Sequence, residues 1–170
     1  IAENKAWGVA PSIAFGLGTD FRAYLAYEHL SRRDRPDWGV PGATIPGLVT
    51  YNPLTRGAPR DAFYGLRSDF DSVDADRLLG RVEYDLTRRA TVSNQTVWTQ
   101  VDRRSRFTMP SGFAPPSRVD SAVTFYDRHN QSVSNTTNLT VDFDTGPVNH
   151  KVSTGIEFSH ETSDADRFGT

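Results

Sequence analysis

The stretch Trp7–Leu30, WGVAPSIAFGLGTDFRAYLAYEHL, decides the fold. In its first half apolar residues alternate with small ones, and in its second half they alternate with arginine, tyrosine, alanine and glutamate. A period of two residues is that of a β-strand, and the sequence Gly18-Thr19-Asp20 between the halves is typical of a tight turn. The stretch therefore predicts an antiparallel β-hairpin with one apolar face. Because Pro11 cannot donate to a β-ladder, we expect a β-bulge there.

The same alternation returns in four later segments, although the apolar side of the second is only half apolar. These expected strands are Arg77–Leu86, Ala90–Thr99, Thr137–Phe143 and Val148–Phe158. Short links at 87–89 and 144–147 join them in pairs. The stretches Ser31–Val73 and Asp102–Gln131 are rich in proline, glycine or arginine and predict long loops. The chain thus reads as six strands whose connections are alternately short and long.

Loop lengths and aromatic positions indicate what the apolar face contacts. Structureless loops of about 30 or 40 residues are uncommon in compact soluble domains, whereas short turns at one end and long loops at the other are typical of outer-membrane barrels. Aromatic residues of the apolar alternation also gather near both ends of the expected strands. They are Phe15, Phe21, Tyr84 and Phe143 near the short turns, and Trp7, Tyr27, Trp98 and Phe158 near the other ends. Spans of ~9 to 11 residues between such aromatic girdles match tilted strands that cross a bilayer.

Composition narrows the choice further. The chain has 170 residues, a net charge of -2 and no cysteine, so a disulfide framework, a thiolate metal site and a nucleic-acid-binding protein are not expected. No apolar run approaches the ~18 residues of a transmembrane helix. The chain also shows no initiator methionine and no signal peptide, so we expect a segment of a longer protein. The alternative to a barrel segment is a soluble β-sandwich with decorated loops, such as a carbohydrate-binding module.

Several segments resemble a known family. WGVAPSIAFGLGT, with YEHLSRRDRPDWGVP after the second strand, is similar to the barrel of TonB-dependent siderophore receptors, especially those for catecholate-type siderophores. The resemblance continues through FYGL, DSVDADRLLGRVEYDL, SNQTVW, NLTVDFDTG and VSTGIEFSHE. No single motif is chemically diagnostic, but their order and spacing together are specific and cover nearly all of the chain outside the two long loops.

The resemblance implies an all-β fold, an antiparallel transmembrane β-barrel segment with short periplasmic turns and long extracellular loops. Residues 1–170 would be about six strands of a monomeric barrel of ~22 strands, and the plug domain, the signal peptide and the remaining strands would lie outside them. The implied function is uptake of a ferric siderophore across the outer membrane of a Gram-negative bacterium. The implied partners are that siderophore, the outer-membrane lipid and, through the plug, the TonB complex of the inner membrane; nucleic acid is not among them. No cofactor is expected, because the iron would travel as the siderophore complex.

A ferric catecholate is a bulky anion with aromatic rims, which arginine and aromatic side chains recognise. Candidate ligand-binding residues must therefore lie on the inward-facing alternation or in the outer loops. Arg32 and Arg103 have the inward parity. The loop candidates are Arg33, Arg35, Trp38, Tyr51, Tyr64, Arg104, Arg106 and Phe107.

Other chemistry is weakly indicated. The acidic residues Asp69, Asp71, Asp74 and Asp76 lack the ligand order and the glycine of a calcium loop, so a polar rim is expected instead of a metal site. No Ser/His/Asp set, catalytic carboxylate pair or phosphate loop is evident, and an enzyme is not expected. Within the family, haem, cobalamin or a glycan are the alternative cargoes.

Overall fold

The computed structural model describes residues 2–54, 59, 61–114 and 118–169. The strands form one antiparallel sheet in the order β1-β3-β4-β5-β6-β7, and β2 also pairs with β3. This confirms the expected fold class. The elements are β1 (Glu3–Val9), β2 (Ser12–Phe15), β3 (Phe21–Arg35), the 3-10 turn η1 (Gly42–Thr44), β4 (Phe70–Thr87), β5 (Ala90–Ala114), β6 (Arg118–Thr145) and β7 (Val148–Gly169). No helix among the described residues is long and apolar enough to cross a membrane.

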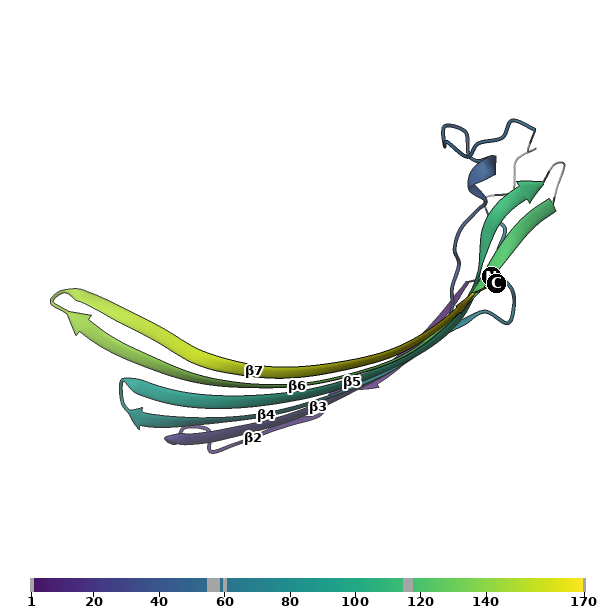
Figure 1. The fold of residues 1–170 in the computed structure, drawn as a ribbon. Coiled ribbons are helices and arrows are strands. Elements are labelled where there is room, and N and C mark those ends of the chain that lie inside the picture. Colours follow the sequence, from purple (N-terminus) through teal and green to yellow (C-terminus); the bar gives the residue numbers. More distant parts are fainter. Residues whose placement is uncertain (1, 55–58, 60, 115–117, 170) are drawn as a thin grey trace.

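The sheet is a single curved layer with two different ends (Figure 1). The turn end carries the short connections β2–β3, β4–β5 and β6–β7. The loop end carries the described part of the connection between β3 and β4 and the outer parts of β5 and β6, which rise on the same side of the layer (Figure 1). Both chain termini also lie at the loop end.

The strand register separates the side chains into two faces. Residues paired directly across a ladder point to the same side of a sheet. The row through Leu25 joins Gly80, Thr96, Asn135 and Phe158. Those residues predicted to be apolar on the six expected strands that have ladder partners fall on this side, which we call the apolar face. The opposite side, which holds Arg22 and its cross-strand partners, is the polar face.

Among the described residues, no second layer packs against the apolar face. Ile13, Leu25, Val82 and Ile156 are 52%, 49%, 43% and 56% exposed, and no hydrophobic residue of the described chain is buried. A soluble domain must bury such a face against a second layer, and the described residues form one sheet. The alternative of a β-sandwich is therefore wrong for the described part of the chain.

Four of the eight aromatic residues predicted to form the two girdles lie together in pairs on the apolar face. Phe21 pairs directly with Tyr84 near the turn end, and Tyr27 lies in the same cross-strand row as Trp98 farther along. Trp7 lies beyond that row, with its ring centroid 4.9 Å from that of His29.

Polar side chains on the apolar face of β5 are hydrogen-bonded to polar side chains of β6. Asn94 donates to the side chains of Asn135 at 3.0 Å and Thr137 at 2.8 Å, and Asn135 donates to Thr96 at 2.7 Å. Polar groups removed from water need such partners. This network explains why β5 can carry asparagine and threonine where its neighbours carry large apolar residues.

The β-bulge expected at Pro11 is absent. The strand is interrupted between β1 and β2, but the pairs Val9–His29 and Ser12–Ala26 belong to one continuous register. Pro11 still accepts a hydrogen bond at its carbonyl oxygen from the Tyr27 N–H, at 3.0 Å. The missing proline N–H therefore costs ladder bonds without adding a residue to the strand, and the predicted single strand becomes two.

The two loops predicted from the sequence are longer than the connections in the structure. Because β3 continues to Arg35 and β4 begins at Phe70, the expected loop Ser31–Val73 is reduced to 36–69. The expected loop Asp102–Gln131 is instead an extension of the β5–β6 hairpin, and its centre, 115–117, lies outside the described residues. At this end both faces carry polar side chains, so the period of two disappears from the hydropathy pattern although the ladder continues.

The turn between β2 and β3 depends on Gly16. Its φ of 70° lies in the left-handed region, and a Cβ there would stand 2.1 Å from the Phe21 carbonyl oxygen. The Thr19 hydroxyl closes the turn by donating to the Gly16 carbonyl oxygen at 2.8 Å. Only glycine fits this position without strain, and the turn occupies 16–20, so it begins earlier than the predicted Gly18.

Candidate functional site

Two neighbouring rows of paired residues cross the polar face at the loop end. The first row joins Arg32, Val73, Arg103, Arg128 and Ala165. The second row, two residues farther along each strand, joins Asp34, Asp71, Ser105, Tyr126 and Arg167. Because side chains two residues apart share a face, the arginines of the first row lie beside the acids and the tyrosine of the second. This register brings together residues from five strands.

Asp71 is the centre of the ion pairs in these rows. Both of its carboxylate oxygens accept from Arg103, with Nε–Oδ1 and Nη2–Oδ2 distances of 2.9 Å. Arg32 lies 3.6 Å from the same carboxylate and 3.0 Å from that of Asp34. The hydrogen bonds with Asp71 raise the pKa of Arg103, so the guanidinium stays charged. A bidentate arginine–carboxylate pair of this kind fixes the orientation of both groups.

Aromatic rings adjoin these ion pairs. Trp38, in the connection between β3 and β4, stacks on Phe107 of β5 with ring centroids 4.5 Å apart. The Arg128 guanidinium lies 5.1 Å from the centroid of the Tyr126 ring. Between them is a hollow of about 210 Å³. Its lining residues are Trp38, Arg103, Ser105, Phe107, Thr124, Tyr126 and Arg167.

The connection between β3 and β4 is tied to the hairpin beneath it at a second point. The Asp69 carboxylate is buried and accepts hydrogen bonds from the backbone N–H of Thr108 at 3.1 Å and from its hydroxyl at 2.9 Å. It also accepts from the Leu66 N–H at 2.8 Å. Together with the Trp38–Phe107 stack, this anchor holds the described part of the loop against β5.

Four of the ten candidate residues from the sequence lie together in this cluster. They are Arg32, Trp38, Arg103 and Phe107. Arg32 and Arg103 have the inward parity that the sequence assigned to them, because both belong to the first row.

The other candidates lie elsewhere. Arg33, Arg35, Arg104 and Arg106 are in strands and not in loops, and the register turns them to the face opposite Arg32. Three of them pair with acids there, Arg33 with Asp74 at 2.7 Å, Arg35 with Glu3 at 3.9 Å and Arg104 with Asp127 at 3.4 Å. Tyr51 is exposed in the loop, and the Tyr64 hydroxyl donates to the Pro59 carbonyl oxygen.

Sequence reasoning missed Tyr126, Arg128 and Arg167. All three lie beyond the predicted strands, in or after stretches where no alternation was apparent. The signal that could have found them is the hairpin itself, because once β5 is extended past Arg103, its partner Arg128 follows from the register.

The acidic run at the start of β4 is divided between the faces. Asp71 bonds Arg103 on the polar face, whereas on the other face Asp74 bonds Arg33 and Asp76 accepts from Tyr27 and lies 2.8 Å from Nδ1 of His29. Within the described part of the chain, no group of three or more histidine, cysteine, aspartate or glutamate side chains is arranged to hold a metal ion.

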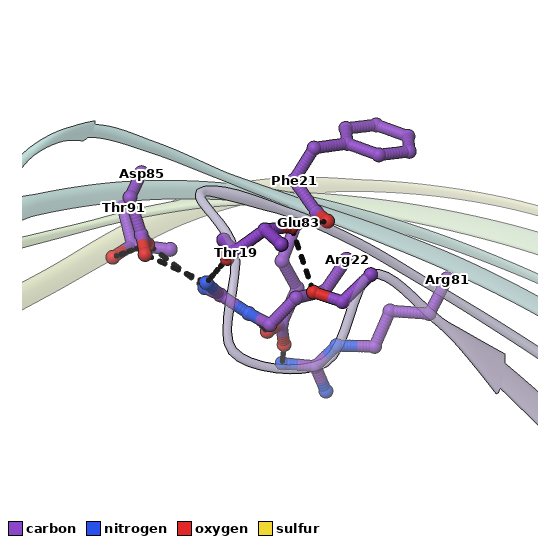
Figure 2. A network of polar contacts seen from close by, with 8 residues as sticks. Thr19, Phe21, Arg22, Arg81, Glu83, Asp85 and Thr91 are labelled. Carbon is purple, nitrogen blue, oxygen red and sulfur yellow. Dashed lines mark hydrogen bonds and ion pairs between the residues drawn. The ribbon is translucent and has the colours of Figure 1, made fainter.

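The turn end of the polar face holds a second cluster of charges (Figure 2). Arg22 donates to Asp85 at 2.6 Å and to Glu83 at 3.1 Å, and Arg81 pairs with Glu83. Thr91 donates to Asp85 at 2.8 Å. Figure 2 shows the Phe21 ring leaving the strand on the side opposite to these groups. Two arginines face two carboxylates, so these ion pairs have no excess charge, and they join β3, β4 and β5.

Comparison with known proteins identifies relatives of this chain. No protein-family model matches the chain. It is 37% identical over 94% of its length to the catecholate siderophore receptor Fiu of Escherichia coli K12, and 32% identical over 96% to the probable TonB-dependent siderophore receptor PiuA of Acinetobacter baumannii. The chain spans 23% of the former relative and 22% of the latter.

Solved structures agree with these relatives. The closed form of the ferric-catecholate import receptor Fiu superimposes with a TM-score of 0.85 at 35% identity, over 95% of this chain and 25% of that one. PiuA of Acinetobacter baumannii gives 0.79 at 27% identity, over 96% of this chain and 24% of that one. By sequence and by structure, the chain is related to the TonB-dependent siderophore receptors and matches a part of their β-barrel.

Proposed function

We propose that the chain is part of the barrel wall of an outer-membrane, TonB-dependent receptor that imports iron as a ferric siderophore. The apolar face would lie against lipid and the polar face would line the interior. The observation that carries the proposal is the cluster at the loop end of the polar face, where arginines and aromatic rings from the loop and from β5, β6 and β7 surround a hollow. Such groups suit a bulky anion with aromatic rims.

The mechanism that follows is capture and passage without covalent chemistry. The loop end, which would face outward, would receive the complex between the arginines and the stacked rings. The TonB complex, acting through a plug outside these residues, would supply the energy for passage. The protein would hold no cofactor of its own, because iron enters and leaves as part of the cargo.

Growth on defined iron sources tests this function. A strain lacking the gene for the full protein, and the same strain with the gene restored, would be starved of iron and then supplied with a ferric catecholate, a ferric hydroxamate or haem. We expect the restored gene to rescue growth on the ferric catecholate only, and only in cells with TonB. Rescue by haem or hydroxamate alone would assign a different cargo, and rescue without TonB would contradict the coupling.

A further inference from the structure

The arginines of the loop-end cluster do not all have carboxylate partners. Arg32 and Arg103 are matched by Asp34 and Asp71. No carboxylate lies within ion-pair distance of Arg128 or Arg167 among the described residues, and the contact of Arg128 is with the Tyr126 ring. The cluster therefore carries an excess positive charge, which is located on β6 and β7.

One of the two unpaired arginines lines the hollow beside Trp38, and the other contacts a ring that lines it. Arg167 lines the hollow and is the register partner of Tyr126, which also lines it. Arg128 precedes Arg167 by one row and lies over the Tyr126 ring. A cation placed beside a ring face attracts and orients a second flat, anionic group.

One residue that lines the hollow, Ser105, has a hydroxyl without a hydrogen-bond partner among the described residues. Ser105 is 1% exposed, and its Oγ has no hydrogen-bond partner in the described structure. Its register neighbours on the two sides are Asp71 and Tyr126. Because a buried hydroxyl without a partner costs free energy, a ligand oxygen that reached this hydroxyl would recover that cost.

The size of the hollow limits what can enter. Pockets that bury a whole drug-sized ligand measure roughly 300–1,000 Å³, and this one measures about 210 Å³. The Trp38–Phe107 stack makes one side of it flat and apolar. One aromatic ring with oxygen substituents fits this description better than a complete siderophore.

We propose that this hollow binds a single anionic aryl group of the cargo, and that Arg128 and Arg167 supply its cationic contacts. Arg32 and Arg103, whose charges are already neutralised, would instead hold the wall in position. The inference rests on the proposed function and goes beyond it in naming which arginines select an anionic cargo.

The test uses the full-length receptor and two simple iron complexes, the anionic iron(III) tris-catecholate and the neutral iron(III) tris-acetohydroxamate. Equilibrium binding of each would be measured for Arg128→Gln, Arg167→Gln and the control Arg104→Gln, which changes an arginine on the opposite face of β5. We expect each of the first two substitutions to weaken binding of the tris-catecholate about tenfold, the size of one lost hydrogen bond to a charged group. Higher salt should narrow the difference, and the control should bind as the unaltered receptor does.

The outcomes separate the two proposals. If the unaltered receptor binds the tris-catecholate and both variants bind it equally well, the assignment of Arg128 and Arg167 is wrong and the function stands. If the unaltered receptor binds the tris-acetohydroxamate but not the tris-catecholate, the proposed cargo is wrong, and the inference with it. The two arginines have no ion pair to lose, so the variants are expected to fold, and circular dichroism would verify this.

Discussion

On the apolar face of β3 and β4, Leu25 and Val82 are about half exposed, whereas the polar face of the same strands holds Arg22 and Glu83 in hydrogen-bonded ion pairs. Many charged groups of the polar face find partners within the sheet, whereas Arg128 and Arg167 have no carboxylate partner among the described residues. The polar contacts of the apolar face are the asparagine–threonine network of β5 and β6 and, toward the loop end, ion pairs such as Arg33–Asp74 and Arg104–Asp127. Under the proposed function, the large exposed apolar side chains of one face would lie against lipid, and the loop end of the other face would hold the ligand.

The largest expected effect comes from placing a charge on the apolar face. Leu25→Arg should destabilise the full-length protein in lipid vesicles by ~2 to 4 kcal/mol, the cost of an arginine facing the middle of the bilayer. Ala26→Arg is the matched control, because it lies one residue on and faces the other side. Denaturant unfolding in vesicles measures both. If Leu25→Arg and Ala26→Arg lowered the free energy of unfolding equally, the assignment of the two faces would be wrong.

A smaller loss is expected when a carboxylate is removed from the polar face. Asp71→Ala leaves Arg103 without either of its hydrogen bonds to this side chain. Hydrogen bonds to charged groups are worth roughly 1.5 to 3 kcal/mol. Because the Arg103 side chain is 44% exposed, solvent screening reduces this to about 1 to 2 kcal/mol. Asp71→Asn should recover part of the loss, since its amide oxygen still accepts one bond. Urea unfolding of both variants measures the losses. If Asp71→Ala lowered the free energy of unfolding less than Asp71→Asn does, the role given to the Asp71–Arg103 pair would be wrong.

The loop should respond to the loss of its aromatic contact. Trp38→Leu keeps an apolar side chain but removes the stack on Phe107, a contact worth about 0.5 to 1.5 kcal/mol beyond its buried area. We expect faster hydrogen exchange in 36–54 and unchanged exchange in the β6–β7 ladder. Trp98→Leu on the apolar face is the comparison and should leave the loop unaffected. Unchanged exchange in the loop would show that the Asp69 anchor alone holds it.

The fold was largely predictable because apolar residues occupy every second position along most of the strands. Wherever apolar residues recur at every second position, as from Phe21 to Tyr27, the predicted strand and its face are those observed. Pro11 shows one limit of the pattern, since a missing N–H predicts that a ladder is interrupted but not whether a residue is inserted. The extension of the β5–β6 hairpin shows another, because a strand polar on both faces resembles a loop in sequence.

The candidate site was predictable only in part, for the same reason. Arg32 and Arg103 could be assigned to a face because each continues the alternation of a strand already recognised. Arg33 and Arg104 are adjacent to them in sequence yet face the other way. Arg128 and Arg167 could be found only through cross-strand partners, which hydropathy does not reveal. Composition identifies the kinds of residue present, but the register decides which of them meet.

The smallest expected effect is the pH dependence of stability that comes from one exposed ion pair, Arg33–Asp74. On the face opposite Asp71, the hydrogen bond from Arg33 holds the pKa of Asp74 below its ordinary value of 3.8. A lowered folded-state pKa means that the pair stabilises the protein fully above the unfolded-state value, and that this contribution is lost as the pH falls through the folded-state pKa. Because the Arg33 and Asp74 side chains are 50% and 39% exposed, the contribution should be only about 0.2 to 1 kcal/mol. Asp74→Asn should therefore be slightly less stable than the unaltered protein at pH 7 and should approach it as the pH falls through the folded-state pKa of Asp74, which lies below 3.8. Stability of both proteins measured across this range tests the pair, and a difference that grows on acidification would contradict the assigned sign.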